Sequence, residues 1–162
     1  MPYRLRSEDV SFVERAPVVV RAETSVPAGP QAVWPALADA AAWPSWFSGM
    51  KDAHYTSPEP YGAGSTRRVR VMSLVADETI LAFDVGKRFA FRVDSTNLPL
   101  LAALVEVVTL EAAGSTTRVV YRQALEPRPW LRLLMPLLRG QMERGLRRGL
   151  DGLAPWVAAH HL

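Results

Sequence analysis

Apolar and polar residues alternate through the middle of the chain, and this period of two predicts β-strands. In residues 65–73 (STRRVRVMS) arginine alternates with valine, as expected for an antiparallel strand with one buried face. Val69 and Val71 are predicted to point inward, and Arg68 and Arg70 toward water. Similar patterns between turns rich in glycine and proline predict strands over residues 18–26, 50–57, 77–85, 87–94, 104–112 and 116–125. No helical pattern separates the last six strands, so the sheet is predicted to be antiparallel.

Two regions carry the helical period of 3.6 residues instead. Two short helices are predicted within residues 28–48, because Pro30 suits a first helical turn and Pro44 breaks the segment that follows. Residues 130–157 predict a long amphipathic helix with a kink or a new start near Pro136. This helix is expected to cover the apolar face of a curved seven-stranded sheet. Its apolar face carries Leu131, Leu134, Leu138, Met142, Leu153 and Trp156.

Two glycines are unusual for a helix interior. Gly145 and Gly149 lie four residues apart, on the same predicted face as Met142 and Leu153. Each costs about 1 kcal/mol relative to alanine, so each needs a reason. Either the sheet packs closely against the helix there, or the missing side chains leave space for a ligand.

Length and composition indicate one ordinary globular domain of 162 residues, 49% of them apolar and 22% charged. Residues 1–16 show little pattern and are expected to form an irregular arm, and residues 159–162 a frayed end. The net charge of +3 does not indicate a nucleic-acid binder. The arginines of the last helix form either a solvated face or a patch for anionic membrane or RNA. No aromatic residues interleave with them, so we expect a solvated face.

Several kinds of chemistry lack their residues. The chain has no cysteine, which excludes disulfides, thiolate catalysis and cysteine zinc sites. Its three histidines support neither a Ser-His-Asp arrangement nor a histidine metal site, and no phosphate-binding glycine loop occurs. We therefore expect no metal and no cofactor. No signal peptide and no run of about 18 apolar residues is present, so we expect a cytoplasmic protein without stable membrane insertion.

The order of the predicted elements is more distinctive than any single motif. The stretches that carry it are VWPALADAAAWPSWF (33–47), PYGAGSTRRVRV (60–71), DETILAFDVGKRFAFRV (77–93) and GSTTRVVYRQALEP (114–127). Together they resemble the polyketide cyclase/dehydrase and lipid-transport family, within the START-like, birch-pollen-allergen-like helix-grip (SRPBCC) group. The likeness covers residues 17–158 and implies a single α+β helix-grip domain.

The resemblance also implies a cavity between the concave face of the sheet and the long helix. With such a cavity, we favour the ligand-space interpretation of Gly145 and Gly149. The family has no invariant catalytic signature, so the likeness implies the fold more firmly than an activity.

Strand parity brings three polar residues toward that cavity. Glu106 shares a face with Val108 and Leu110, so it points inward if they do, whereas another register would expose it. A buried carboxyl group could bind a ligand hydroxyl or transfer a proton. Glu106 is the candidate catalytic residue, although the sequence indicates no catalytic set. Tyr121 and Gln123 share one face and offer a hydroxyl and an amide, unless Tyr121 is a plain core residue.

Apolar and aromatic residues complete the predicted lining. Trp46 suits either the rim of a pocket or packing between helices and sheet. Tyr55 shares a face with Ala53, which places His54 on the outer surface. The predicted ligand-binding residues are Trp46, Tyr55, Val69, Val71, Phe91, Glu106, Val108, Tyr121, Gln123, Leu138, Met142, Gly145 and Gly149.

Three functions fit these features. The first is non-covalent binding of a hydrophobic or aromatic small molecule by a monomer or weak homodimer. The second is an aromatase/cyclase-like enzyme that uses acid/base residues in the same cavity. The third is a partner-binding or chaperone-assisting domain, which a large apolar patch outside the pocket would favour.

Overall fold

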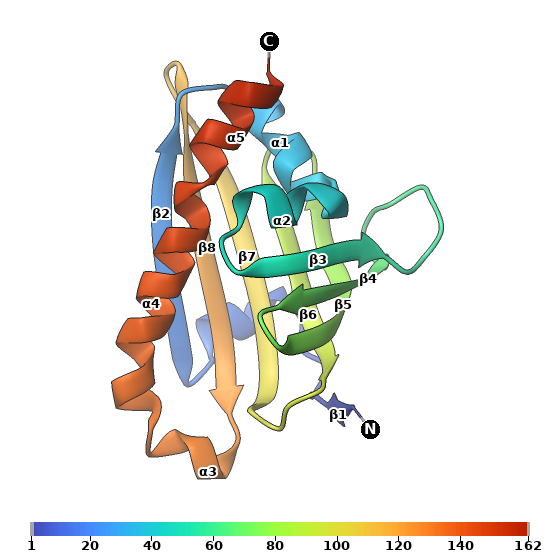
Figure 1. Ribbon diagram of the computed structural model, residues 1–162, viewed down its shortest axis with the longest axis vertical. Coiled ribbons are helices and arrows are strands. Elements are labelled where there is room, and N and C mark those ends of the chain that lie inside the picture. The colour runs from blue at the N-terminus through green and yellow to red at the C-terminus, as the bar shows by residue number, and fades with distance from the viewer. Residues whose placement is uncertain (1, 162) are drawn as a thin grey trace.

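The computed structural model, which describes residues 2–161, contains an antiparallel sheet curled beside a long C-terminal helical segment (Figure 1). Seven strands follow the order β2-β8-β7-β6-β5-β4-β3, and the short strand β1 pairs with β6. The predicted curved seven-stranded antiparallel sheet is therefore confirmed. The short strand β1, near the N-terminus of the chain, adds to the predicted seven. The strands are β1 (Tyr3–Arg4), β2 (Val18–Val26), β3 (Met50–Tyr55), β4 (Thr66–Val71), β5 (Leu74–Asp84), β6 (Arg88–Thr96), β7 (Leu101–Ala113) and β8 (Thr116–Pro127).

Short helices connect β2 to β3 and close one end of the curled sheet (Figure 1). They are α1 (Pro30–Ala38), the 3-10 turn η2 (Ala40–Ala42) and α2 (Trp43–Trp46). Indole N–H groups fold them onto one another: Trp43 Nε1 donates to the Leu37 carbonyl (3.0 Å) and Trp46 Nε1 to the Ala36 carbonyl (2.9 Å). Both tryptophans are buried. Their N–H groups are satisfied by backbone, so the pair can pack as apolar surface.

The predicted C-terminal helix is divided into α3 (Pro129–Arg132), α4 (Met135–Asp151) and α5 (Leu153–His160). Pro136 lies in the first turn of α4, where its missing N–H costs nothing, so the chain makes a new start there. The second break, at Gly152, has another cause. A Cβ placed on Gly152 would lie 2.0 Å from the backbone oxygen of Trp46. The backbone of α2 thus presses directly on the junction between α4 and α5.

The ligand-space interpretation of Gly145 and Gly149 is wrong. Gly145 is exposed, and a Cβ there would meet nothing within 4 Å. Gly149 is buried by close packing, since its Cβ would lie 2.5 Å from the Phe47 ring. The two glycines differ because of their positions relative to the buried stripe of these helices. The stripe begins at Leu146, and Gly145 lies about 100° around the helix from that residue. That stripe consists of Leu146, Leu150, Leu153 and Val157.

The N-terminal segment covers the outer face of the sheet. Its 3-10 helix η1 (Val10–Glu14) begins at Asp9, whose carboxylate accepts a hydrogen bond from Ser11 N (2.9 Å). Phe12 and Val13 are buried against a second apolar cluster. The segment expected to be irregular is thus ordered in part, although Met1 lies outside the described residues. The other members of the cluster are Ala82, Ala90, Ala103, Val105, Val107 and Ala124.

The C-terminal end differs from its expectation in a similar way. Helix α5 continues to His160, beyond the predicted end at residue 157. The ring of His160 stacks on Trp156, with ring centroids 4.1 Å apart. Leu162, which belongs to the expected frayed end, lies outside the described residues.

Candidate functional site

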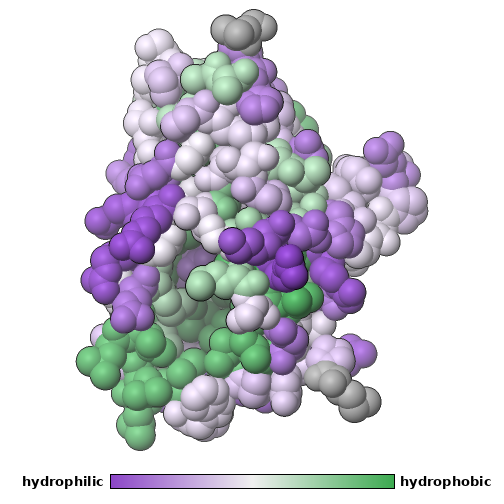
Figure 2. Space-filling view, viewed as in Figure 1, coloured by the Kyte–Doolittle hydropathy of each residue, from purple (hydrophilic) through white to green (hydrophobic). Residues whose placement is uncertain are grey.

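A cavity of about 490 Å³ lies between the concave face of the sheet and α4. In Figure 2 it is visible as a hollow bordered by apolar surface, between α4 and the strands β3 to β5. The wall is mainly aliphatic and aromatic, with polar groups in a few places. The lining residues are Phe47, Met50, Val69, Val71, Leu74, Ala76, Glu78, Phe91, Val93, Thr96, Leu100, Leu101, Leu104, Glu106, Tyr121, Gln123, Leu125, Leu131, Met135, Leu138, Gln141 and Met142.

Glu106, Tyr121 and Gln123 form a polar cluster on this wall. Glu106 on β7 lies directly opposite Gln123 on β8 in the strand register. The Tyr121 hydroxyl donates to Glu106 Oε2 (2.6 Å), and Gln123 Nε2 donates to Glu106 Oε1 (2.7 Å). Both carboxyl oxygens therefore have a donor. The register that parity predicted for these three residues is the one the structure has.

Burial raises the pKa of Glu106 to about 7, and the hydrogen bonds from Tyr121 and Gln123 oppose this rise. A carboxyl group with this pKa exchanges its proton near neutral pH. It can donate a hydrogen bond to a ligand carbonyl when protonated, or accept one from a ligand hydroxyl when ionised. Burial also raises the pKa of Tyr121 well above its ordinary value, and the neighbouring Glu106 charge adds to this. Tyr121 is therefore a hydroxyl donor, not a phenolate.

A buried ion pair joins the strands β4 and β5. Arg67 on β4 pairs with Glu78 on β5, and its Nε donates to Glu78 Oε2 (2.5 Å). The Arg67 side chain is fully buried, and its Nη1 and Nη2 have no hydrogen-bond partner among the described residues. Three aromatic rings surround it instead. The guanidinium carbon lies 4.5 Å from the ring centroid of Phe91, 4.7 Å from that of Trp43 and 5.3 Å from that of Phe89.

The aromatic rings supply the guanidinium with cation–π attraction in place of hydrogen bonds. Burial raises the pKa of Glu78, and the Arg67 charge opposes this. Glu78 lines the cavity while Arg67 does not. The lining of the cavity therefore includes two carboxyl groups, Glu78 and Glu106, and no arginine.

Eight of the predicted binding residues line the cavity, and five do not. Trp46 is buried and holds α2 to α1 through the Ala36 carbonyl. Tyr55 donates to the Ala38 carbonyl (2.8 Å) and stacks on Tyr61. Val108 is buried in the core, Gly149 packs on Phe47, and Gly145 is exposed. The residues that do line the cavity are Val69, Val71, Phe91, Glu106, Tyr121, Gln123, Leu138 and Met142.

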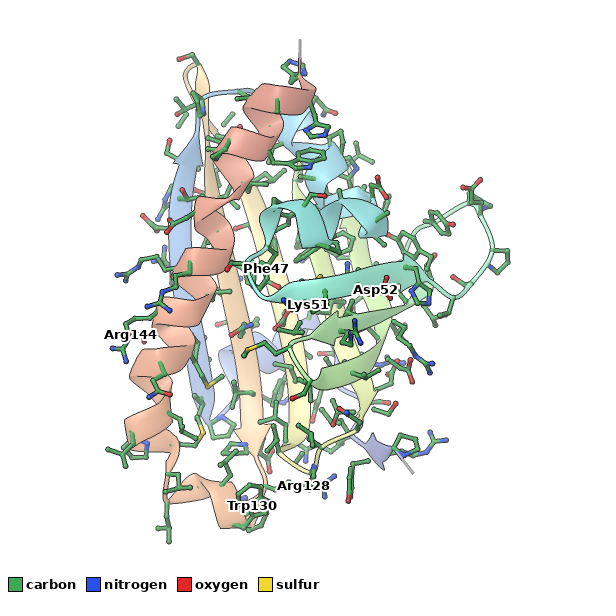
Figure 3. All side chains as sticks on the ribbon, in the orientation of Figure 1. Phe47, Lys51, Asp52, Arg128, Trp130 and Arg144 are labelled. Carbon is green, nitrogen blue, oxygen red and sulfur yellow. The ribbon has the colours of Figure 1, made fainter. Side chains whose placement is uncertain are left out.

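Sequence reasoning missed several residues of the site. Arg67 has the same strand parity as Val69 and Val71, so the alternation already placed it on the inner face. Arg67 was nevertheless assigned neither a face nor a role from the sequence. Phe47, which follows α2 and is labelled beside α4 in Figure 3, lines the cavity. No periodic signal marks Phe47, because it belongs to a connection.

Among residues 2–161, no group of three or more histidine, aspartate or glutamate side chains is arranged to hold a metal ion. His54 is exposed and contacts Asp52 (2.9 Å), which agrees with the expected surface position. In the same range, no helix is long and apolar enough to cross a membrane.

Comparisons with known proteins extend this picture. A family model described as "Polyketide cyclase / dehydrase and lipid transport" matches residues 17–157. An uncharacterized protein of Mycobacterium tuberculosis is 32% identical over 143 residues, which is 85% of this chain and 86% of that protein.

Solved structures share the fold at lower sequence identity. A protein from Thermus thermophilus has a TM-score of 0.75 at 22% identity, covering 90% of this chain and 100% of its own. The Zhui aromatase/cyclase from Streptomyces sp. R1128 has a TM-score of 0.75 at 14% identity, covering 88% and 94%. A START superfamily protein from Mycobacterium smegmatis has a TM-score of 0.63 at 14% identity, covering 83% and 98%. These likenesses establish the START-like helix-grip fold.

Proposed function

Because the chain belongs to the polyketide cyclase/dehydrase and lipid-transport family, we propose that it binds a neutral, hydrophobic small molecule without covalent chemistry. The observation that carries this proposal is the apolar cavity of about 490 Å³ with one polar cluster on its wall. Such a wall favours an apolar molecule through burial, and the cluster orients it through one or two hydrogen bonds. Glu106, Tyr121 and Gln123 are the polar contacts of this proposal.

The charges around the cavity narrow the ligand class. Glu78 and Glu106 both line it, whereas the Arg67 guanidinium is held by Glu78 and three aromatic rings. A ligand carboxylate would face ionised Glu106 in a medium of low dielectric constant, where like charges repel strongly. The Arg67–Glu78 pair would offer that carboxylate no free cation, because the Arg67 charge is already compensated by Glu78. A hydroxyl or carbonyl group would instead find a partner in Glu106. We therefore propose an alcohol, phenol or ketone in preference to a fatty acid.

Displacement of a neutral apolar dye tests this proposal. Nile red should bind saturably, and its fluorescence should fall when a long-chain alcohol competes. A fatty acid of the same chain length should compete at least about tenfold more weakly above the pKa of Glu106, which is a difference of about 1.4 kcal/mol. Glu106→Gln, which cannot ionise, should narrow the gap between alcohol and acid. Absence of saturable binding, or equal competition by both, would refute the proposed ligand class.

An enzyme of the aromatase/cyclase kind is the second candidate. The observation that favours it is Glu106 with a pKa of about 7, hydrogen-bonded to the Tyr121 hydroxyl within the cavity. That pair could move a proton during cyclisation or dehydration of a poly-β-ketone chain. Turnover of such a substrate that Glu106→Gln abolishes, with dye binding intact, would establish the enzymatic function over simple binding.

A partner-binding or chaperone-assisting role is the third candidate. An apolar patch outside the cavity was its criterion, and exposed apolar residues do occur at the start of the C-terminal helical segment. Neighbouring residues of that same segment line the cavity. This continuity favours a surface that serves ligand entry over one that serves an unrelated protein partner.

A further inference from the structure

The segment from Trp130 to Leu137 exposes unusually large apolar side chains. The exposed fractions are 89% for Leu133, 76% for Leu137, 56% for Trp130 and 45% for Leu134. We call these four residues the leucine tip. In Figure 2 the leucines of the tip belong to the green surface at the lower left, where Figure 1 places the start of α4. Clusters of this kind on a folded surface mark a binding site for another apolar phase.

The fold does not account for the leucine tip. Leu131, Met135 and Leu138 of the same helices turn inward and line the cavity, so the fold accounts for these apolar side chains. The tip residues alternate with them and face outward, which makes the segment apolar on both sides. Trp130 is anchored by its Nε1, which donates to the Pro99 carbonyl (2.9 Å), while more than half of its side chain stays exposed. Figure 3 shows Trp130 at the end of α3 that follows β8.

Positive charge adjoins this apolar surface along α4. Residues 126–151 contain six arginines and three acidic residues. Arg144, Arg147 and Arg148 form no ion pair within the described part of the chain, and Figure 3 shows Arg144 pointing away from the molecule. Leucine and tryptophan beside exposed arginines are typical of segments that lie in the interface of an anionic bilayer.

We propose that the leucine tip docks reversibly on an anionic lipid bilayer, with the arginines of α4 against the headgroups. A second copy fits less well, because pairing two tips would bring two arginine-rich helices together. Docking also has a consequence for the cavity. The tip and the cavity lining alternate along one segment, so insertion of the tip places the cavity wall at the hydrocarbon boundary. An apolar ligand can then exchange with the bilayer without crossing water; this last step rests on the proposed ligand binding.

Vesicle flotation tests the docking. The wild-type chain should float with phosphatidylcholine vesicles that contain phosphatidylglycerol, and much less with pure phosphatidylcholine. Leu133→Ser combined with Leu137→Ser should weaken binding about tenfold or more, because two exposed leucines can no longer be buried. Arg144→Gln combined with Arg147→Gln should weaken binding to the anionic vesicles and flatten its salt dependence. The matched control is Val85→Ser, since Val85 is 54% exposed in the turn between β5 and β6, away from the tip.

Nile red binding of each variant separates this proposal from the proposed function. The leucine-tip variant should bind the dye as the wild type does. Failure of the wild type to float, or equal flotation of the leucine-tip variant, would overturn the docking even if dye binding persists. Self-association that the tip substitutions abolish, without vesicle binding, would assign the tip to a second copy. Vesicle binding without dye binding would support docking and refute the cavity function.

Discussion

Glu106 is a carboxyl group that the fold buries and yet keeps close to its titration point. Its two oxygens accept from Tyr121 and Gln123, but neither donor carries a full charge. Burial therefore dominates and raises its pKa from an ordinary 4.5 to about 7. A folded-state pKa above the unfolded value means that ionisation of Glu106 opposes folding. The cost is absent below the unfolded pKa, grows as the pH rises through this interval, and is complete above about 7.

Replacement of Glu106 by glutamine should make this cost visible. Relative to wild type, Glu106→Gln should gain up to about 3 kcal/mol of unfolding free energy between about pH 4.5 and about pH 8, since one pKa unit corresponds to about 1.4 kcal/mol. Urea denaturation of both proteins at several pH values measures the difference. If that difference does not change with pH, the carboxyl group is hydrated or ion-paired in solution.

Removing one charge of the Arg67–Glu78 pair should lower the free energy of unfolding, whereas removing the Glu106 charge should raise it. Arg67→Met leaves the Glu78 carboxyl buried without its cation, which should cost about 3–5 kcal/mol of unfolding free energy. Arg68 is the matched control, because it lies on the same strand and holds Asp77 at the surface through two hydrogen bonds (2.7 and 3.1 Å). Arg68→Met should change the free energy of unfolding much less than Arg67→Met, because water screens the exposed pair. The double change Arg67→Met with Glu78→Leu should recover most of the loss, since it removes both charges. A small effect of Arg67→Met alone would contradict the ion pair's structural role.

The sequence predicted individual cavity residues well where strand parity applied. Val69, Val71, Phe91, Tyr121 and Gln123 were placed on the inner face from alternation alone, and all line the cavity. Arg67 obeyed the same parity but was assigned no role, because a buried arginine requires a partner on another strand. That partner, Glu78, is adjacent only through the β4–β5 register, which a one-strand pattern does not contain.

At the level of elements, the position of α2 depends on two glycines of the C-terminal segment. Gly149 receives the Phe47 ring and Gly152 receives the Trp46 carbonyl, so α2 rests on the junction of α4 and α5. Gly145 receives nothing. The helical period placed Gly145 and Gly149 on one face, but it cannot tell which side of a helix another helix will meet.

Alanine substitutions should separate the three glycines. Gly145→Ala should stabilise the protein by about 0.5–1 kcal/mol, because the position is helical, exposed and free of neighbours. Gly152→Ala should destabilise it by about 1–3 kcal/mol or more, since a backbone atom at 2.0 Å cannot rotate away. Gly149→Ala should fall between them, because the Phe47 ring can shift, though at the expense of the cavity wall it forms. Thermal unfolding of the three variants gives the order, and a stable Gly152→Ala variant would contradict the α2 contact.

The antiparallel sheet, the short helices that follow its first long strand and the C-terminal helical segment were predicted from the sequence, whereas β1, η1 and the strand irregularities were not. The pairing of β5 with β6 shifts between Ile80 and Ala82. As a result Ile80 packs into the concave core, while Ala82, of the same parity, packs against the N-terminal segment on the outer face. A β-bulge changes which face a residue occupies, and no composition signal marks this one.

Across the whole molecule, the sheet separates a filled core from an open one. On the outer face, Phe12 and Val13 close a layer of small residues completely, including Ala82 at 5% exposure. On the concave face, the wall encloses about 490 Å³ that no described side chain fills. The N-terminal segment lacks periodicity because it forms no amphipathic element. It contributes the short strand β1, one capped turn and the buried side chains of Leu5, Phe12 and Val13. Its contribution could not be predicted without knowing that the central strands are buried on both faces.

Because the outer face is filled and the concave face is open, replacing alanine by phenylalanine should affect stability differently at two positions of β5. Ala76 and Ala82 both lie on β5 and are equally buried, at 5% exposure each, but Ala76 lines the cavity and Ala82 packs under η1. Ala76→Phe should place its ring in the open volume, so stability should change by less than about 1 kcal/mol or rise, because lining atoms gain contacts. Nile red binding should then weaken about tenfold or more.

Ala82→Phe should instead overpack a closed layer and cost about 1–3 kcal/mol of unfolding free energy, with the dye affinity of the folded fraction unchanged. Urea denaturation and dye titration of the two variants, measured side by side, check both halves of the comparison. If Ala76→Phe unfolds the protein as readily as Ala82→Phe, the concave face is as closely packed in solution as the outer one. If Ala76→Phe is stable and binds the dye normally, the dye occupies another surface, and the cavity is not where an apolar ligand is held.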